Sequence, residues 1–198
     1  MSVLLVIAGP SGVGKGTIVR RLLDRRARLW ASVSATTRSP RDGEQDGREY
    51  LFLDPGEFQR WVDAGDFLES FAVFGARYGT PRRPVEEHLA AGNDVVAEVD
   101  VHGALAIRTA FPDALLVFLK PPSRDVQRRR LVDRDPSADA EALERRLSEA
   151  DAEEALGATF DVTVVNDDLE RAVDEILAHV DARDRDTGSS TSPVTGGC

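Results

Sequence analysis

Cysteine is almost absent from this sequence: Cys198, the last of the 198 residues, is the only one. A single cysteine cannot form an internal disulfide, so a small secreted domain built on a disulfide framework is excluded. Long apolar runs are also missing, and nothing approaches the roughly 20 residues that cross a membrane. The apolar run 3–8 is too short, and lacks the preceding basic segment, for a signal peptide. We therefore expect a cytoplasmic chain without a membrane partner.

An excess of basic residues is missing as well. The net charge is −10, which argues against general nucleic-acid binding, because that requires a basic surface. The charge is unevenly distributed, with nine basic and five acidic side chains in residues 1–50 but three and twelve in residues 151–198. We expect the basic first quarter to bind an anion and the acidic end to be solvated surface.

Lysine is scarce, since only Lys15 and Lys120 are lysines among the 25 basic residues. Lys15 stands in a glycine-rich stretch between the apolar run 3–8, typical of a buried parallel strand, and a helical pattern over 18–23. Strand, glycine loop and helix in this order predict a phosphate-binding loop, whereas an isolated glycine-rich turn would lack this context. Backbone N–H groups, the helix N-terminus and the lysine would bind the phosphates of a nucleotide, which the family resemblance described below implies to be ATP. The stretch comprises Gly9, Pro10, Ser11, Gly12, Val13, Gly14, Lys15, Gly16 and Thr17.

One position of this loop departs from the usual pattern. Gly16 stands where a serine or threonine hydroxyl ordinarily binds Mg²⁺, and Thr17 follows it. The Gly-Lys-Gly-Thr sequence resembles the loop of adenylate kinases. That resemblance implies that Mg²⁺ is held by phosphates and water, with no direct loop hydroxyl, and no direct protein ligand is assigned.

Strand and helix signals alternate along the chain, which predicts an α/β fold with a central parallel sheet flanked by helices. Two stretches, at about 34–84 and 124–150, interrupt this alternation as insertions over a nucleotide site would. The segment 54–65 has an Asp cap, a proline at the first helical position and a glycine at its end, which predicts a helix. The expected strands are 30–35, 50–53, 67–74, 94–100, 114–119 and 162–165; the other expected helices are 81–91, 103–110, two within 123–155 joined near 135–136, and one ending at about 182. Residues 183–198 have almost nothing to bury, so we expect a disordered tail.

Several polar residues are candidates for the site, each with a structural alternative. Glu69 lies in an apolar strand, where it faces either a pocket or solvent. Asp100 ends a core strand, where α/β proteins bind ligands, and could equally cap the next helix. Arg38 and Arg41 suit a bidentate grip on phosphate but could be surface arginines. The charge run after 123 is typical of a solvated helix face.

Taken together, these segments resemble guanylate kinases from about residue 3 to residue 182. The most specific block is Val33 to Arg41, followed by Gly43-Glu44, Gly47 and Tyr50. The other matching blocks are Phe67-Leu68-Glu69, Tyr78-Gly79-Thr80, Glu98-Val99-Asp100, Pro121-Pro122-Ser123 and the stretch from Val164 to Asp168. Their common order and spacing carry the resemblance.

The resemblance implies a role for each matching residue. It places guanine recognition on Ser34, Glu69 and Thr80, since a carboxylate can accept from guanine N1–H and NH₂ while hydroxyls donate to O6. The implied GMP phosphate clamp is Arg38, Arg41, Tyr50 and Tyr78. The implied lid arginines are Arg130, Arg134 and Arg146. Asn166 is implied near the adenine, and Asp100 near the acceptor phosphate, where it and Thr17 are outer-shell candidates for Mg²⁺.

The implied organisation is a P-loop NTPase-type core (about 1–33, 85–123 and 151–182), a small GMP-binding α+β insertion (about 34–84) and a helical lid (about 124–150). The implied reaction is the Mg²⁺-assisted conversion of ATP and GMP to ADP and GDP in purine nucleotide metabolism, with dGMP as a further expected acceptor. ATP and GMP are then the partners, and the oligomeric state is left open, as monomer or homo-oligomer.

Two positions differ from the family's common residues: Gly16 replaces serine, and His102 replaces glutamine. Two other functions are compatible with parts of the pattern. A kinase for a phosphorylated sugar would have no use for the guanine-binding set. A non-catalytic guanylate-kinase-like scaffold domain would not require Lys15 or the arginine-rich lid. The intact loop and Glu69 therefore favour the kinase.

Overall fold

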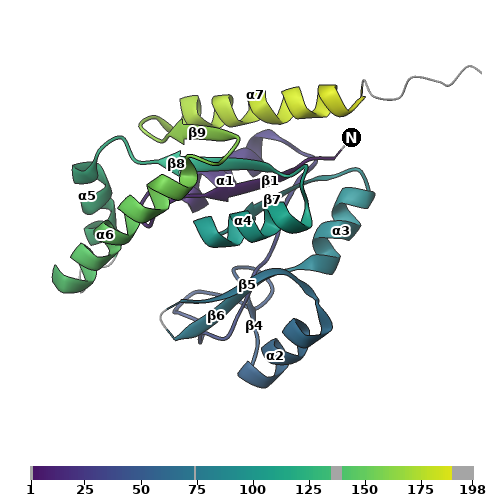
Figure 1. Cartoon of the computed structure of the whole chain (residues 1–198), viewed down its shortest axis with the longest axis horizontal. Coiled ribbons are helices and arrows are strands. Elements are labelled where there is room, and N and C mark those ends of the chain that lie inside the picture. The colour runs from purple at the N-terminus through teal and green to yellow at the C-terminus, as the bar shows by residue number, and fades with distance from the viewer. Residues whose placement is uncertain (1, 74, 135–139, 189–198) are drawn as a thin grey trace, which may run out of the picture.

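The computed structural model describes residues 2–73, 75–134 and 140–188 (Figure 1). Its larger part is a five-stranded sheet in which every neighbouring pair is parallel. The strands in spatial order are β2 (Leu29–Ala31), β7 (Asp94–Glu98), β1 (Leu4–Ala8), β8 (Leu115–Lys120) and β9 (Val162–Val165). Because parallel strands are covered on both faces, every residue of β1 is buried, and so is every residue of β8 except the last.

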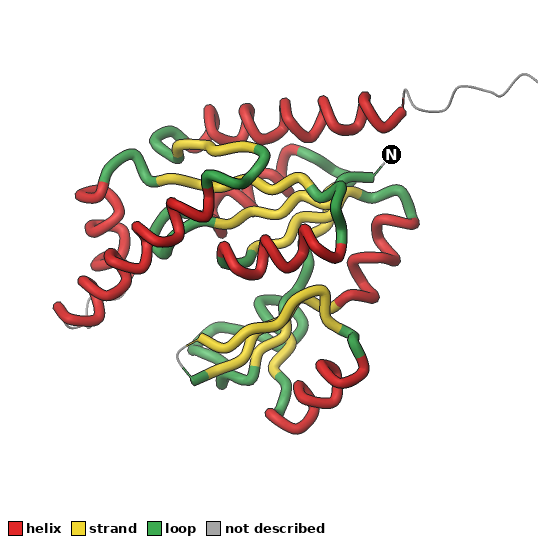
Figure 2. The backbone as a smooth tube through the Cα atoms, in the orientation of Figure 1, coloured by secondary structure: helices red, strands yellow, loops and turns green. Residues whose placement is uncertain are grey.

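Two apolar layers flank this sheet. On one face, Leu5 and Ile7 of β1 pack with α1 (Lys15–Arg25) and α7 (Leu169–Gly188). On the other face, Leu4 and Val6 pack with α3 (Arg82–Ala90) and α4 (Val101–Ala110). Alternate residues of one strand thus build both halves of the core. Figure 2 shows helices on both sides of this sheet.

A second, smaller sheet lies below the first in Figure 1. Its strands in spatial order are β4 (Leu51–Phe52), β3 (Ala35–Thr36), β6 (Ala76–Pro81) and β5 (Phe67–Val73). Helix α2 (Pro55–Ala64) covers it, with Phe58 packed against Phe67. Asp54 caps this helix by accepting from the N–H groups of Gly56 and Glu57 at 2.8 and 2.9 Å.

Helices α5 (Arg124–Arg134) and α6 (Ala140–Gly157) stand beside the phosphate-binding loop (Figure 1). The side chain of Gln127 is fully buried, and its amide donates to the Ser11 carbonyl at 2.9 Å. Leu131 packs over Gly12. The first part of the expected lid is therefore fixed to the loop.

The structure confirms the parallel sheet and the helix at 54–65, whose Gly65 adopts the left-handed conformation (φ 75°). The single strand expected over 30–35 is wrong, because β2 and β3 belong to different sheets. Residues 75–80, which we expected to form a turn that returns the chain, lie mostly in β6 (Ala76–Pro81), which pairs with β3 and β5.

The expected end of the last helix at 182, and the start of a disordered tail at 183, are also wrong. Helix α7 continues to Gly188. Arg183 donates to the Asp113 carbonyl and pairs with Asp161, and Asp184 pairs with Arg28. These ion pairs extend the helix without apolar burial. The remaining tail residues 189–198 and the joint expected near 135–136 lie outside the described residues.

Candidate functional site

The phosphate-binding loop joins the end of β1 to the start of α1, as the sequence pattern predicts. Gly12 and Gly14 adopt positive φ angles of 79° and 97°, which favour glycine. At Gly14 a Cβ atom would also lie 2.6 Å from Nδ2 of Asn166. Lys15 is the first residue of α1, and its Nζ donates to the Gly9 carbonyl at 2.5 Å. The ammonium group therefore lies over the concave side of the loop.

A cavity of about 710 Å³ opens at this loop. Asn166 closes one side and donates through Nδ2 to the Val13 carbonyl at 2.8 Å. Arg130 of α5 donates to the carbonyls of Val13 and Asn166 at 3.0 and 3.1 Å. The cavity is also lined by the loop residues from Pro10 to Thr17, and by Arg20, Glu98, Asp167 and Leu169. Its size and its place at the N-terminus of α1 suit a nucleotide polyphosphate.

A second cavity, of about 600 Å³, lies between the two sheets. Ser34, Tyr50 and Tyr78 enter it from the smaller sheet and the segments beside it. Asp100 enters from the core, and its carboxylate accepts from the Gly103 N–H at 2.6 Å, so it caps α4 as well. The interpretation of Asp100 as a helix cap is therefore confirmed, and its role towards a ligand stays a prediction.

Glu69 of β5 also lines this cavity and is 6% exposed, which excludes the solvent-facing alternative. Its Oε1 accepts from the Thr80 hydroxyl at 2.5 Å, whereas its Oε2 is buried and has no hydrogen-bond partner in the described part of the chain. Burial raises the pKa of this carboxyl group to about 7, although the hydrogen bond from Thr80 acts in the opposite direction. The free oxygen can accept from a ligand N–H group.

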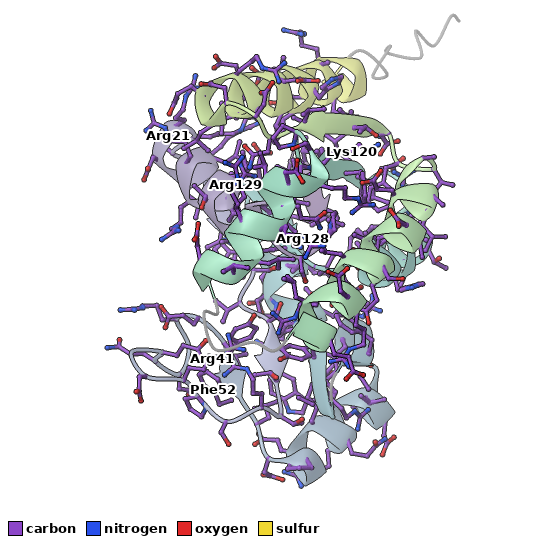
Figure 3. All side chains as sticks on the ribbon, turned by 90° about the vertical axis from the view of Figure 1, so that its left-hand side faces the viewer. Arg21, Arg41, Phe52, Lys120, Arg128 and Arg129 are labelled. Carbon is purple, nitrogen blue, oxygen red and sulfur yellow. The ribbon has the colours of Figure 1, made fainter. Side chains whose placement is uncertain are left out.

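The arginines of the expected phosphate clamp lie beside the second cavity, in the segment between β3 and β4. Arg38 donates to Glu44 at 2.9 Å, and its guanidinium carbon lies 5.4 Å from the centre of the Tyr50 ring. Glu44 also accepts from the backbone N–H of Arg41 at 2.8 Å. Arg41 is exposed and lies near Phe52 in Figure 3, where Arg128 and Arg129 of α5 are seen above it. Burial and the charge of Glu98 raise the pKa of Tyr50, so its hydroxyl remains a donor.

The expected lid arginines fall into three situations. Arg130 contacts the phosphate-binding loop, as described above. Arg146 lies half-buried on α6. Arg134 ends α5, and its side chain lies outside the described residues.

The two cavities meet, because Ser11, Lys15 and Glu98 line both. Lys15 thus lies where groups bound in the two cavities would come together. The oxygen donors at this junction, among them Asp100 and Glu98, are of the kind that a hard divalent cation prefers. Among the described residues, no group of three or more His, Cys, Asp or Glu side chains is placed to hold a metal ion.

Sequence reasoning assigned no role to three acidic residues that line the cavities: Glu98, which was noted only as part of a matching block, Glu149 and Glu153. Glu153 of α6 lies near Lys15, and burial raises the pKa of its carboxyl group. The charge run over 123–155 is typical of a solvated face, so its pattern gave no signal for this site. His102, noted only as an unusual residue, also lines the cavity.

None of the described helices is long and apolar enough to span a membrane. The profile of the guanylate kinase family matches residues 1–183. A guanylate kinase of Gloeobacter violaceus is 52% identical over 176 residues, which are 89% of this chain and 85% of that protein. One of Thermobifida fusca is 49% identical over 179 residues, which are 90% of this chain and 91% of that protein. The crystal structure of guanylate kinase from Anaplasma phagocytophilum superposes with a TM-score of 0.75 at 30% identity, covering 91% of this chain and 85% of that one.

Proposed function

The chain belongs to the guanylate kinase family, whose members transfer a phosphoryl group from ATP to GMP, and from this premise we propose how its own residues divide the work. ATP occupies the cavity at the phosphate-binding loop, and GMP occupies the cavity between the sheets. Buried Glu69, with one unpartnered oxygen, carries this assignment.

Guanine recognition centres on Glu69. Guanine presents N1–H and NH₂ side by side, and a carboxylate can accept from both, whereas adenine lacks this pair of donors. Because the Thr80 hydroxyl already donates to Glu69, Thr80 positions the carboxylate, and Ser34 is the hydroxyl left to donate to O6. A buried carboxylate oxygen without a partner is costly, so donation from guanine stabilises the complex.

The GMP phosphate binds towards the junction. Tyr50 and Tyr78 are donors within the cavity, and the Arg38 guanidinium reaches the phosphate by exchanging its contact with Glu44. The exposed side chain of Arg41 joins it from the same segment. The acceptor oxygen is already anionic, so no strong general base is required. Lys15 and Arg130 neutralise charge on the transferring group, and closure of α6 over the junction keeps water out.

The family's divalent metal is proposed to be Mg²⁺, bound with ATP. When bound, Mg²⁺ neutralises phosphate charge and orients the polyphosphate. The carboxylates at the junction would hold it, with Asp100 and Thr17 acting through water. Asn166 closes the adenine end of the ATP cavity.

An ADP-release assay with a panel of acceptors tests this proposal. GMP should be turned over rapidly and dGMP measurably, whereas AMP and ribose 5-phosphate should give rates close to the background ATPase rate. Turnover of ribose 5-phosphate equal to that of GMP would show a phosphate acceptor site without base recognition. Binding of GMP without ADP release would point to a scaffold domain.

A further inference from the structure

Phe71 is an apolar side chain in a cavity whose walls are mostly polar, and no step of the proposed function uses it. It lies on β5 two residues after Glu69, so both side chains are on the same side of the strand, and both line the cavity between the sheets. The ring of Phe71 is half-buried. Because β5 packs against α4, Phe71 lies where the smaller sheet meets the core.

On one side, Phe71 contacts the residues of the expected phosphate clamp. The register of β5 and β6 pairs it with Tyr78, and the two rings are stacked with their centres 6.1 Å apart and their planes at 21°. Tyr78 in turn meets the ring of Tyr50 edge-on at 6.0 Å, and the guanidinium group of Arg38 lies over Tyr50. Ring contacts thus run without a break from Phe71 to the arginine of the clamp.

On its other side, Phe71 packs on the first turn of α4. Gly103 in this turn has a φ outside the positive range, so its backbone conformation does not call for glycine. The space does, because a Cβ atom at position 103 would lie 3.3 Å from Cε1 of Phe71 and 3.2 Å from Oδ1 of Asp100, and both distances are tighter than ordinary contacts. The Gly103 N–H also donates to the Asp100 carboxylate at 2.6 Å. The ring therefore packs on the same turn that fixes Asp100.

Resting on the GMP site proposed above, we propose that Phe71 is a positioning residue for the phosphate clamp. Packed on the bare backbone of Gly103, its ring holds Tyr78 at a fixed place relative to Asp100 and the junction of the two cavities. Close-packed contacts pass a displacement on to their neighbours, so a shift of this ring moves the clamp. Phosphoryl transfer depends on the alignment of acceptor and donor, which this contact maintains.

The test separates the phosphate of GMP from its base. Affinities for GMP and for guanosine, which lacks the phosphate, would be measured by calorimetry for the wild-type chain, Phe71→Leu, Gly103→Ala and the double variant, together with kcat and Tm. Phe111→Leu is the matched control, because Phe111 ends α4, packs against the core and lines neither of the two cavities. It repeats the same substitution on an aromatic side chain beside the same helix.

Phe71→Leu should weaken GMP binding about tenfold, the effect of poorly placed hydrogen bonds to a charged group. Its affinity for guanosine should stay within about twofold of wild type, because the base contacts do not involve the clamp. The kcat value should fall about 10- to 100-fold, since a displacement of about 1 Å is enough for such a loss. A selective loss of phosphate binding separates positioning from a merely structural role, which would lower Tm alone, as we expect for Phe111→Leu.

Gly103→Ala should lower kcat in the same direction, because the added methyl group presses on the ring from the other side. If both substitutions disturb one contact, the double variant should lose less than the product of the two single losses. Losses that multiply would overturn the link through Gly103.

Equal losses of affinity for GMP and guanosine in Phe71→Leu would make the ring a wall of the base site and overturn the proposal. GMP affinity and kcat within about twofold of wild type would overturn it as well. If the wild-type chain bound no GMP, the proposed function itself would be wrong. Normal binding and turnover of GMP by the wild-type chain, without a selective loss in Phe71→Leu, would contradict this inference alone.

Discussion

At the scale of single residues, the burial of Glu69 affects both the pKa of its carboxyl group and its proposed role in binding guanine. Burial raises the pKa of its carboxyl group from 4.5 to about 7, so a proton is bound to much of the substrate-free protein at neutral pH. In the unfolded chain this carboxyl group has the lower pKa of 4.5, so it ionises at a lower pH than in the folded protein. The contribution of Glu69 to the free energy of unfolding therefore falls as the pH rises from about 4.5 to about 7. Guanine needs the ionised form, because both of its N–H groups donate.

Binding of GMP below pH 7 must therefore release the proton from Glu69. We expect the KM for GMP to fall about tenfold as the pH rises from about 6 to about 8, since one ionisation controls the binding-competent form. Steady-state kinetics across this range would measure it. The GMP phosphate also titrates near pH 6, so Glu69→Gln is the control, and its KM should change less. Identical pH profiles for the two proteins would contradict the role of Glu69.

Lys15 allows a matched comparison, because the chain has only one other lysine. Lys15→Ala should lower kcat about 10³-fold, as expected for loss of a group that stabilises transition-state charge, with little change in Tm. Lys120 pairs with Glu154 at 3.1 Å on the surface, so Lys120→Ala should keep near wild-type kcat. Equal kcat values for Lys15→Ala and Lys120→Ala would show that Lys15 does not stabilise the transition state.

At the scale of elements, a cluster of charges fastens α7 to the amino end of the core sheet. Asp94, the fully buried first residue of β7, accepts from the Val3 N–H at 2.8 Å and pairs with Arg26 at 2.5 Å and Arg28 at 3.0 Å. Arg26 also pairs with Asp181 of α7 at 2.6 Å. The cluster lies at the strand edge opposite the nucleotide cavities.

Removing the buried charge should destabilise the fold and leave the chemistry unchanged. Asp94→Asn should lower the free energy of unfolding by about 3 kcal/mol, because two arginines lose a buried partner. Asp181 is 52% exposed in its side chain, so Asp181→Asn should cost less than about 1 kcal/mol. Urea unfolding gives both values, and the KM values for ATP and GMP should remain at wild type in both variants. If both variants lost a similar free energy of unfolding, the buried ion pairs of Asp94 would contribute no more than the exposed pair of Asp181.

Elements with strong local signals could be predicted from the sequence. The loop at 9–17 and the capped helix at 54–65 depend on neighbouring residues, and both appear as expected. Strand β6 could not be predicted, because Arg77-Tyr78-Gly79-Thr80 has turn-like composition and becomes a strand only through pairing with β3 and β5. The end of α7 was missed because partners distant in sequence, such as Arg28 and Asp161, hold it.

At the scale of the whole molecule, the proposed function assigns one substrate to each sheet, and the two cavities meet at one junction. The parallel core positions the loop and Arg130, and the smaller sheet positions Glu69 and Thr80. Lys15 and Glu98 lie where the cavities join. Phosphoryl transfer depends mainly on alignment and charge neutralisation, so this junction is the arrangement that the reaction needs.

The junction itself could not be predicted from sequence patterns alone. Glu98 ends a strand in the same way as many solvent-exposed residues do, and Glu153 lies in a run typical of a solvated helix. Their position in the cavities follows from strand register and helix packing, which are long-range properties. The family resemblance assigned roles to the guanine and phosphate residues, because their spacing is itself part of the motif, and these roles stay predictions.

Base choice by Glu69 is the central claim, and one comparison tests it most directly. Initial rates with GMP and AMP would be measured at fixed ATP for the wild-type chain and Glu69→Gln. Loss of a buried charged acceptor costs about 1–3 kcal/mol, so the KM for GMP should rise about tenfold or more and the preference for GMP over AMP should narrow, while the KM for ATP stays constant. An unchanged preference for GMP in Glu69→Gln would show that another group selects the base.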